Sequence, residues 1–430
     1  MSLQSKLIAA AKRAKHAAAD RHAAPAPLSP VRRIERVALG ERVCAMTFDD
    51  GPCQLPPSHG SGDRSLTLTL LEILEAHNAR GTFDVIGDTA DNYPDEAGKE
   101  GTAAWGGVRY DHYPDIRQDQ LGGALHGPAL IDRMLSAEHA VTNHTYRHIL
   151  YGKKNVIYGK RAHLDTIDEV IADLRRLHDL LRERHGYTMT LSRPPHYVDQ
   201  IPDGFSSYDA YAVLGYQYMA ASFDGAGWLP LDGGYEAEVA AMTGPMEALL
   251  AEDPDALCGQ IIFQKDGFNM ARRTPVADGL EQQLRILDRY GYRVVTVPAL
   301  LELSPFADVF PDDPCAAAGR ALDAAGLVPA FRDNTLRPDA PMTAAELYQT
   351  LYGRAAVLQA VAEHRPETKP YAVAMALAVR DGLPAVDGNA PVTAELLQAV
   401  LRARGKESPI LPGGPLKRRD ILPALAAALG

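Results

Sequence analysis

The strongest constraint in this sequence is an apolar run, Val43–Phe48, that leads directly into two adjacent carboxylates, Asp49 and Asp50, and then into a Gly-Pro pair. The run has the composition of a buried strand, and the Gly-Pro pair marks a turn at its end. Neighbouring residues of an extended chain point to opposite faces. We therefore expect the two aspartates to have different roles, one binding a metal ion while the other stays available as a base.

Two histidines complete this pattern. His144 and His148 are four residues apart, so both imidazoles would share one face if the segment opens a helix. With Asp50 they would form a metal site of two nitrogens and one oxygen with room for water, as in a hydrolytic zinc centre. The histidine spacing is weak alone, because it arises by chance in about one of two such chains with 14 histidines. The position of both motifs after strand-like runs favours the metal site.

Five blocks of the chain resemble, in order and in spacing, those of the polysaccharide deacetylase family, carbohydrate esterase family four. They are Thr47–Pro52, Gly81–Gly87, His144–His148, Arg193–Pro195 and Gly291–Val297. The resemblance covers residues 37–303 and implies an α/β fold, a distorted (β/α)7 barrel of the TIM-like kind.

The hydrophobic pattern also predicts a parallel sheet. Seven strand-like segments alternate with amphipathic, helix-like segments, and the candidate functional residues follow strand ends. This arrangement is typical of a closed α/β barrel whose site lies at the C-terminal face of the strands. The strand candidates are 42–48, 81–86, 139–143, 188–192, 216–223, 259–264 and 292–297.

The resemblance implies roles for the residues that match its motifs. Asp50, His144 and His148 would hold one divalent metal ion, with Zn2+ as the expected ion. Such an ion lowers the pKa of a bound water towards ~7 and polarises the acetyl carbonyl. Asp49 would be the general base, and Arg193 would lie beside it and keep it ionised and oriented. The alternative for Arg193 is a surface salt bridge.

Three further residues are expected on the substrate side. The backbone N–H of His196 or Tyr197 would stabilise the oxyanion. The family has Tyr directly after the Pro-Pro pair, whereas His196 intervenes here. Trp228 would form a wall of the acetyl pocket, with a place in the core as the alternative.

The chain departs from the family on the side of the general acid. Gly227 stands where the fourth motif carries an aspartate, and Lys265 stands where the fifth carries a histidine. In the family that histidine protonates the leaving amine and the aspartate supports it. We expect Lys265 to act as the proton donor. In the alternative, Lys265 lies on the surface and His196 or a water molecule donates the proton.

Three segments are expected along the chain. Residues 1–36 combine a basic, Ala-rich helix with a Pro-rich linker, 37–303 form the barrel, and 304–430 form a helical domain. The last segment resembles S-layer homology repeats, and the matching stretches are Met342–Glu346, Pro391–Glu395 and Pro415–Asp420. Ala344 replaces the basic residue of that family, so binding of an anionic cell-wall polymer and simple packing on the barrel both stay open.

Composition limits the classes of binding partner and the cellular compartment that we expect. The formal net charge of −11 and the pI near 5.7 argue against a nucleic-acid partner and suit an uncharged or cationic glycan. The four cysteines are widely scattered, which predicts neither a zinc ribbon nor a disulfide scaffold. We find no apolar leader and no membrane-spanning run. As written, the chain is expected in the cytoplasm, and the resemblance implies the cell envelope if a leader is missing.

These expectations combine into a function. We expect a hydrolase that uses a metal-activated water to remove acetyl groups from an acetylated carbohydrate, acting on a C–N bond that is not a peptide, with N-acetylglucosamine-type glycans favoured. Two alternatives stay open. One is a barrel that retains the metal and binds glycan but is catalytically weak, and the other is a related C–N hydrolase of small cyclic amides.

Overall fold

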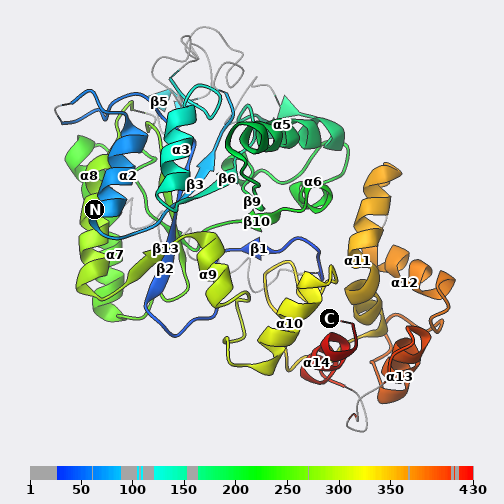
Figure 1. The fold of residues 1–430 in the computed structure, drawn as a ribbon. Coiled ribbons are helices and arrows are strands. Elements are labelled where there is room, and N and C mark those ends of the chain that lie inside the picture. Colours follow the sequence, from blue (N-terminus) through cyan, green and yellow to red (C-terminus); the bar gives the residue numbers. More distant parts are fainter. Residues whose placement is uncertain are drawn as a thin grey trace.

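A parallel β-sheet, curled into an open barrel, forms the larger part of the molecule (Figure 1). The computed structural model describes residues 27–60, 62–88, 121–152, 163–269, 271–366, 369–407, 411 and 416–429, with the backbone of 104–105 and 108–109. In spatial order the strands are β1 (Arg33–Ile34), β10 (Gln217–Met219), β9 (Leu191–Ser192), β6 (Ala140–Asn143), β3 (Thr82–Val85), β2 (Val43–Asp49), β12 (Ile261–Lys265) and β11 (Phe223–Asp224), and β13 (Arg293–Val295) also pairs with β2. All of these pairings are parallel.

The connection between β10 and β11 makes the sheet curl. The two strands lie near opposite ends of the strand order, yet only residues 220–222 separate them in the chain. So short a link spans at most about 3.5 Å per residue, so the two ends of the sheet must approach each other. The predicted distorted (β/α)7 barrel is confirmed, and the strand expected at 216–223 is divided between its two ends.

The sheet also begins earlier than expected. β1 lies inside the segment 1–36 that we expected to be a helix and linker, and its residues Arg33 and Ile34 pair with Tyr218 and Met219 of β10. Ile34 is fully buried. The expected basic helix lies outside the described residues. Two further pairs of strands are β4 (Ala104–Trp105) with β5 (Val108–Arg109) and β7 (Leu150–Tyr151) with β8 (His163–Leu164).

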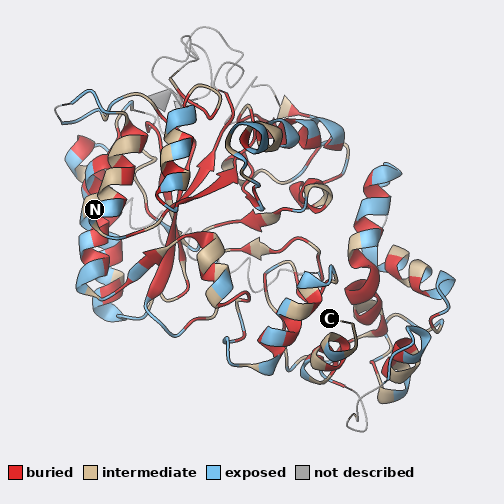
Figure 2. Ribbon diagram, viewed as in Figure 1, coloured by how far each residue is buried: buried red, intermediate tan, exposed pale blue. Residues whose placement is uncertain are grey.

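The strand β2 lies in the middle of the sheet. All seven of its residues are buried, and it pairs with β3, β12 and β13. Figure 2 shows the strands buried and the surrounding helices exposed on their outer sides. Continuous burial of this kind is typical of a parallel strand covered on both faces. The run Val43–Phe48 therefore behaves as its composition predicts.

Helices cover the outside of the sheet. They are α2 (Leu66–Ala76), α3 (Pro128–Ser136), α5 (Ile167–His185), α6 (Ser207–Leu214), α7 (Gly234–Glu252), α8 (Val276–Arg289) and α9 (Val297–Leu303). In α5, Thr166 and Glu169 form a capping box at the start, and Gly186 ends the helix with a φ of 63°. None of the described helices is both long enough and apolar enough to cross a membrane.

The C-terminal part is helical, as predicted, and has a buried core of its own. Its elements, among the described residues, are α10 (Pro314–Ala324), α11 (Ala344–Ala362), α12 (Pro370–Arg380), α13 (Ala394–Ala403) and α14 (Arg418–Leu429). In Figure 1 these helices form a group to one side of the barrel.

Three of these helices start from a ring of backbone hydrogen bonds. The Val392 N–H donates to Met342 O (2.8 Å), the Leu416 N–H donates to Val392 O (3.0 Å), and the Met342 N–H donates to Leu416 O (3.4 Å). Each of these buried residues lies two positions before the first residue of α11, α13 or α14. The three stretches matched in the sequence therefore meet in a threefold arrangement. It supports an internal repeat, whereas the resemblance to S-layer homology repeats stays a prediction.

The segment that contains β1 joins the barrel to the C-terminal helices. The Arg32 guanidinium is buried and donates to Pro305 O and Asn334 Oδ1, both at 3.3 Å, and to Asp323 Oδ2 at 2.8 Å. On the other side of the interface, Val357 of α11 belongs to the apolar core of the barrel. The two parts thus share buried contacts.

Replacing Arg32 tests how strongly these contacts stabilise the fold. The variant Arg32→Met leaves the Asp323 carboxylate without its cation and several buried acceptors without a donor. We expect a loss of about 2–3 kcal/mol in the free energy of unfolding, measured by chemical denaturation. As a control, Arg320→Met removes an exposed arginine of α10 and should change stability by less than about 0.5 kcal/mol. Equal losses in both variants would contradict the prediction.

Candidate functional site

Five neighbouring strands bring polar side chains together at their C-terminal ends. Asp49 ends β2, and its register partners are Lys265 at the end of β12 and Asp84 on β3. His144 follows β6, and Arg193 follows β9. This is the end of a parallel barrel at which functional residues gather.

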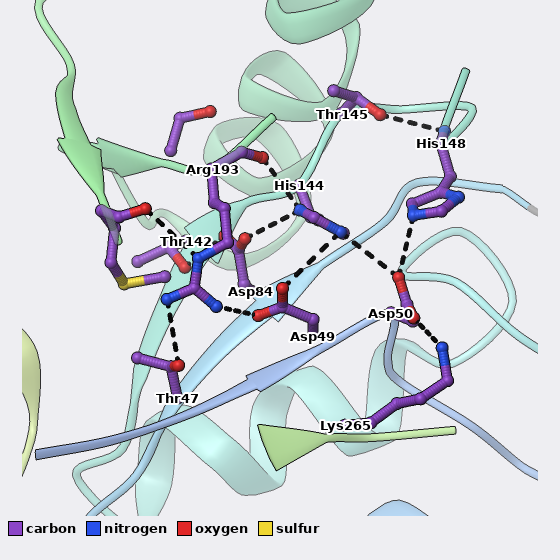
Figure 3. A network of polar contacts seen from close by, with 12 residues as sticks. Thr47, Asp49, Asp50, Asp84, Thr142, His144, Thr145, His148, Arg193 and Lys265 are labelled. Carbon is purple, nitrogen blue, oxygen red and sulfur yellow. Dashed lines mark hydrogen bonds and ion pairs between the residues drawn. The ribbon is translucent and has the colours of Figure 1, made fainter. Parts of the chain in front are cut away.

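Three predicted metal ligands converge on one point (Figure 3). Nε2 of His148 lies 2.9 Å from Asp50 Oδ1, and Nε2 of His144 lies 3.3 Å from the same oxygen. The two imidazole rings are 5.0 Å apart, and all three side chains are buried. Two imidazole nitrogens and one carboxylate oxygen form a donor set that suits Zn2+ and leaves a position for water.

The backbone reaches this arrangement differently from the prediction. Residues 144–148 form a loop and no helix, in which Thr145 and His148 adopt left-handed conformations with φ of 74° and 53°. The His148 N–H donates to Thr145 Oγ1 at 2.9 Å, which fixes the loop locally. The helical explanation of the histidine spacing is therefore wrong, although the histidines do meet.

The two adjacent aspartates also lie closer together than strand alternation predicts. Asp50 leaves β2 with a φ of 77°, so it no longer follows the alternating geometry of an extended chain. His144 Nε2 lies 3.9 Å from Asp49 Oδ2 and 3.3 Å from Asp50 Oδ1. Both carboxylates thus approach the same imidazole.

Asp84 is a site residue that our sequence analysis missed. Its fully buried carboxylate lies 2.9 Å from His144 Nδ1 and accepts a hydrogen bond of 2.6 Å from Thr142 Oγ1. The carbonyl oxygen of Arg193 also lies 2.9 Å from His144 Nδ1. A carboxylate and a carbonyl at one imidazole nitrogen together orient the other nitrogen towards a metal ion. The signal was present in the sequence, because Thr47-Phe48-Asp49 and Thr82-Phe83-Asp84 repeat the same tripeptide and pair in register.

The two histidines differ in their protonation. Burial lowers the pKa of His144, but the neighbouring Asp84 and Asp49 outweigh it and raise the pKa well above its usual value. Burial lowers the pKa of His148 to about 4, against the effect of Asp50. His148 is therefore neutral at pH 7, which is the form that binds a metal ion.

The predicted base, Asp49, lies beside Arg193. The Arg193 guanidinium is fully buried and donates to Asp49 Oδ1, to Thr47 Oγ1 at 3.1 Å and to Ala220 O at 3.2 Å. Burial raises the pKa of Asp49 to about 7, and Arg193 and His144 oppose this shift. Arg193 is thus no surface residue, but it offsets the cost of burying Asp49 only in part.

Lys265 lies in the site and not on the surface. Its ammonium contacts Asp50 Oδ2, the oxygen that the histidines do not face. The next residue, Asp266, is fully buried and accepts hydrogen bonds from Thr67 Oγ1 at 2.9 and 2.7 Å. Burial raises the pKa of Asp266 to about 7. Gly51 allows this packing, because a Cβ there would stand 2.0 Å from Asp266 Oδ2.

Two of the predicted substrate residues lie next to other residues of the site. The half-buried His196 has its ring 5.4 Å from that of His148. Tyr197 lies against Arg193, whose guanidinium carbon is 5.5 Å from the centre of the tyrosine ring. The Tyr197 N–H donates to Pro194 O at 3.1 Å. This N–H is therefore already used in a turn, and the oxyanion role of His196 or Tyr197 stays a prediction.

The third predicted substrate residue, Trp228, follows β11. Its indole N–H donates at 3.2 Å to the carboxylate of Asp224, four residues earlier. A role in an acetyl pocket stays a prediction. Gly227 has a φ of 82°, and a Cβ there would meet Met242 Sδ at 2.9 Å. An aspartate could not simply be restored at this position.

These observations describe a buried cluster at the C-terminal end of a parallel barrel, in which Asp50, His144 and His148 could hold a metal ion. A family model described as polysaccharide deacetylase matches residues 36–201, a range that contains Asp49, Asp50, His144, His148 and Arg193. No protein of curated function is detectably similar to the chain. The match does not reach the C-terminal helices, for which binding of a cell-wall polymer stays a prediction.

Several solved structures are similar in fold. A chitin deacetylase from Colletotrichum lindemuthianum is 19% identical over 66% of this chain and 95% of its own, with a TM-score of 0.41. The peptidoglycan deacetylase PdaC from Bacillus subtilis is 20% identical over 62% and 93%, with a TM-score of 0.38. A CE4 family pseudoenzyme from Bacillus anthracis is 14% identical over 65% and 69%, with a TM-score of 0.40. These similarities are too weak to carry a functional argument.

The contact between Asp84 and His144 generates a prediction. Asp84→Asn removes the charge that orients His144 while preserving shape, and we expect the Zn2+ dissociation constant to rise about 10- to 100-fold. The measurement is competition with a chromophoric chelator. The matched variant Thr142→Val removes the hydroxyl that contacts Asp84 and Phe83 O but keeps the Asp84 charge, and it should weaken binding less. Unchanged affinity in Asp84→Asn, with the fold intact by circular dichroism, would contradict the role.

Proposed function

We propose that this protein is a metal-dependent hydrolase of the polysaccharide deacetylase family that removes acetyl groups from an acetylated carbohydrate, with N-acetylglucosamine-type glycans as the favoured substrates. One observation carries the proposal: Nε2 of His144 and Nε2 of His148 face the same oxygen of Asp50, directly beside the buried Asp49. The family match over residues 36–201 supports it.

The residues have distinct roles in this proposal. Asp50, His144 and His148 would hold Zn2+, which would polarise the acetyl carbonyl and acidify a water molecule. Arg193 holds Asp49 Oδ1, so Oδ2, on the side of His144, is the oxygen that accepts the proton of the water. With a pKa raised to about 7, Asp49 is basic enough to accept a proton near neutral pH.

The leaving amine needs a proton, and two residues are candidates. We assign this role first to Lys265, because its ammonium lies among the site residues at the end of β12. His196 is the alternative, since its ring lies beside that of His148. In the family a histidine donates this proton. Lys265 stands at the position of that histidine, whereas His196 would do the same work from a different position.

Two features favour a second candidate function. The Asp50 carboxylate already contacts a cation, the Lys265 ammonium, and Gly227 stands where the family has an acid. A barrel that binds glycan but is catalytically weak would tolerate both features. Glycan binding without release of acetate would favour this candidate, and turnover of small cyclic amides without glycan turnover would identify a different hydrolase.

Acetate release from acetylated chitooligosaccharides tests the proposed function. We expect wild type to release acetate in the presence of Zn2+, and Asp49→Asn to lose about 10²- to 10⁴-fold in turnover while retaining Zn2+, because the base is gone but the ligands remain. His148→Ala should lose both turnover and stoichiometric Zn2+, measured by metal analysis. If His148→Ala and wild type bind the same substoichiometric amount of metal, the ligand assignment is wrong.

The raised pKa of Asp49 predicts the dependence of turnover on pH. The base acts only when ionised, so turnover should fall about tenfold for each pH unit below the pKa of Asp49. This pKa is about 7 in the metal-free site, and a bound Zn2+ lowers it. The measurement is acetate release from pH 5.5 to 9 at saturating Zn2+, with metal occupancy determined at each pH. A profile that is unchanged between wild type and Asp49→Asn at full occupancy would exclude Asp49 as the base.

A further inference from the structure

The two oxygens of the Asp50 carboxylate have different partners. His144 and His148 face Oδ1 at 3.3 and 2.9 Å, whereas the Lys265 ammonium contacts Oδ2 (Figure 3). Lys265 reaches this oxygen from β12, where it is the register partner of Asp49. We find no second hydrogen-bond acceptor for its ammonium within the part of the chain that the structure describes. The whole charge of this lysine is thus directed at a candidate metal ligand.

The environment makes this charge effective. The Lys265 side chain is only 10% exposed and the Asp50 side chain 7% exposed, so salt and water screen their interaction weakly. The lysine side chain also packs along the backbone of the next turn, because a Cβ at Gly267 would stand 3.4 Å from Lys265 Cε and 3.8 Å from Asp50 Cβ. The ammonium is therefore held at the carboxylate by packing as well as by charge.

A divalent ion among the three ligands would meet this ammonium at short range. It would share a single carboxylate with an existing positive charge, and like charges repel strongly where the solvent is excluded. A second cation, the Arg193 guanidinium, donates a hydrogen bond to the carboxylate of Asp49, the residue before Asp50. The metal-free site thus holds the Lys265 ammonium and the Arg193 guanidinium beside the His144 imidazole, whose raised pKa also favours its charged form.

We propose that Lys265 is a built-in competitor of the metal ion: its ammonium compensates Asp50 in the metal-free protein and lowers the affinity of the Asp50, His144 and His148 site for Zn2+. The site therefore exchanges its ion readily and fills only when the divalent ion is abundant. This inference rests on the proposed metal-dependent function and adds to it the residue that sets the metal affinity.

The test compares Zn2+ affinity in four proteins by competition with a chromophoric chelator. Lys265→Met keeps the length of the side chain but removes the charge, and we expect its Zn2+ dissociation constant to fall about 10- to 100-fold below that of wild type. Lys265→Arg keeps the charge and should stay within about threefold of wild type. Lys417→Met removes an exposed lysine far along the chain, which pairs only loosely with Asp339 at 3.9 Å, and should leave the affinity unchanged.

Thermal unfolding provides a second readout that does not depend on activity. Without metal, Lys265→Met removes the ammonium from Oδ2 of the buried Asp50, so its unfolding temperature should lie below that of wild type. Saturating Zn2+ should raise the unfolding temperature of this variant by more than it raises that of wild type, because the tighter ion stabilises the folded state more. If Lys265→Met does not fold, Lys265→Gln serves the same comparison.

The outcomes separate this inference from the proposed function. Equal or weaker Zn2+ binding by Lys265→Met, with binding by wild type intact, overturns the competition and leaves the metal site standing. Absence of Zn2+ binding in wild type and in Lys265→Met alike, or binding that His148→Ala does not weaken, overturns the metal site and the inference with it.

Discussion

Four buried carboxyl groups lie at the C-terminal ends of the neighbouring strands β2, β3 and β12, and the cost of burying them determines which side chains surround them. A buried charge must be paired or hydrogen-bonded, or it is neutralised. Each of these groups has a partner from a different element: Asp49 has Arg193, Asp50 has Lys265, Asp84 has His144 and Thr142, and Asp266 has Thr67. Because the partners come from β6, β9, β12 and α2, the residues that form the site also hold the strands together.

The sequence allowed much of this site to be predicted. The fold class followed from alternating strand and helix patterns, which depend on local periodicity and on burial of whole strands. Asp49, Asp50, His144 and His148 were found because two motifs with metal-binding or basic side chains come after predicted strands, and the ends of parallel strands meet at one edge. Arg193 was found through the family resemblance. No knowledge of contacts was needed for that step.

The remaining features depend on contacts that local patterns do not encode. The loop at 144–148 was missed because spacing alone cannot distinguish a helix from a loop with left-handed residues, such as Thr145. Asp84 was missed because its role arises from pairing with a neighbouring strand. The contact of Lys265 with Asp50 depends on the lateral order of β2 and β12, which are far apart in the sequence. The sequence patterns located the strands but did not give their lateral order in the sheet, which determines these contacts.

The ring of Met342, Val392 and Leu416 has a consequence for how the chain is completed during synthesis. Each member supplies one backbone donor and one backbone acceptor to the other two, so any two of them leave an unpaired N–H and an unpaired carbonyl at the ring. The ring can therefore close only after Leu416 has left the ribosome, when the barrel is long complete in sequence. This ring therefore depends on a residue made late, whereas the barrel strands can pair while the rest is still being made.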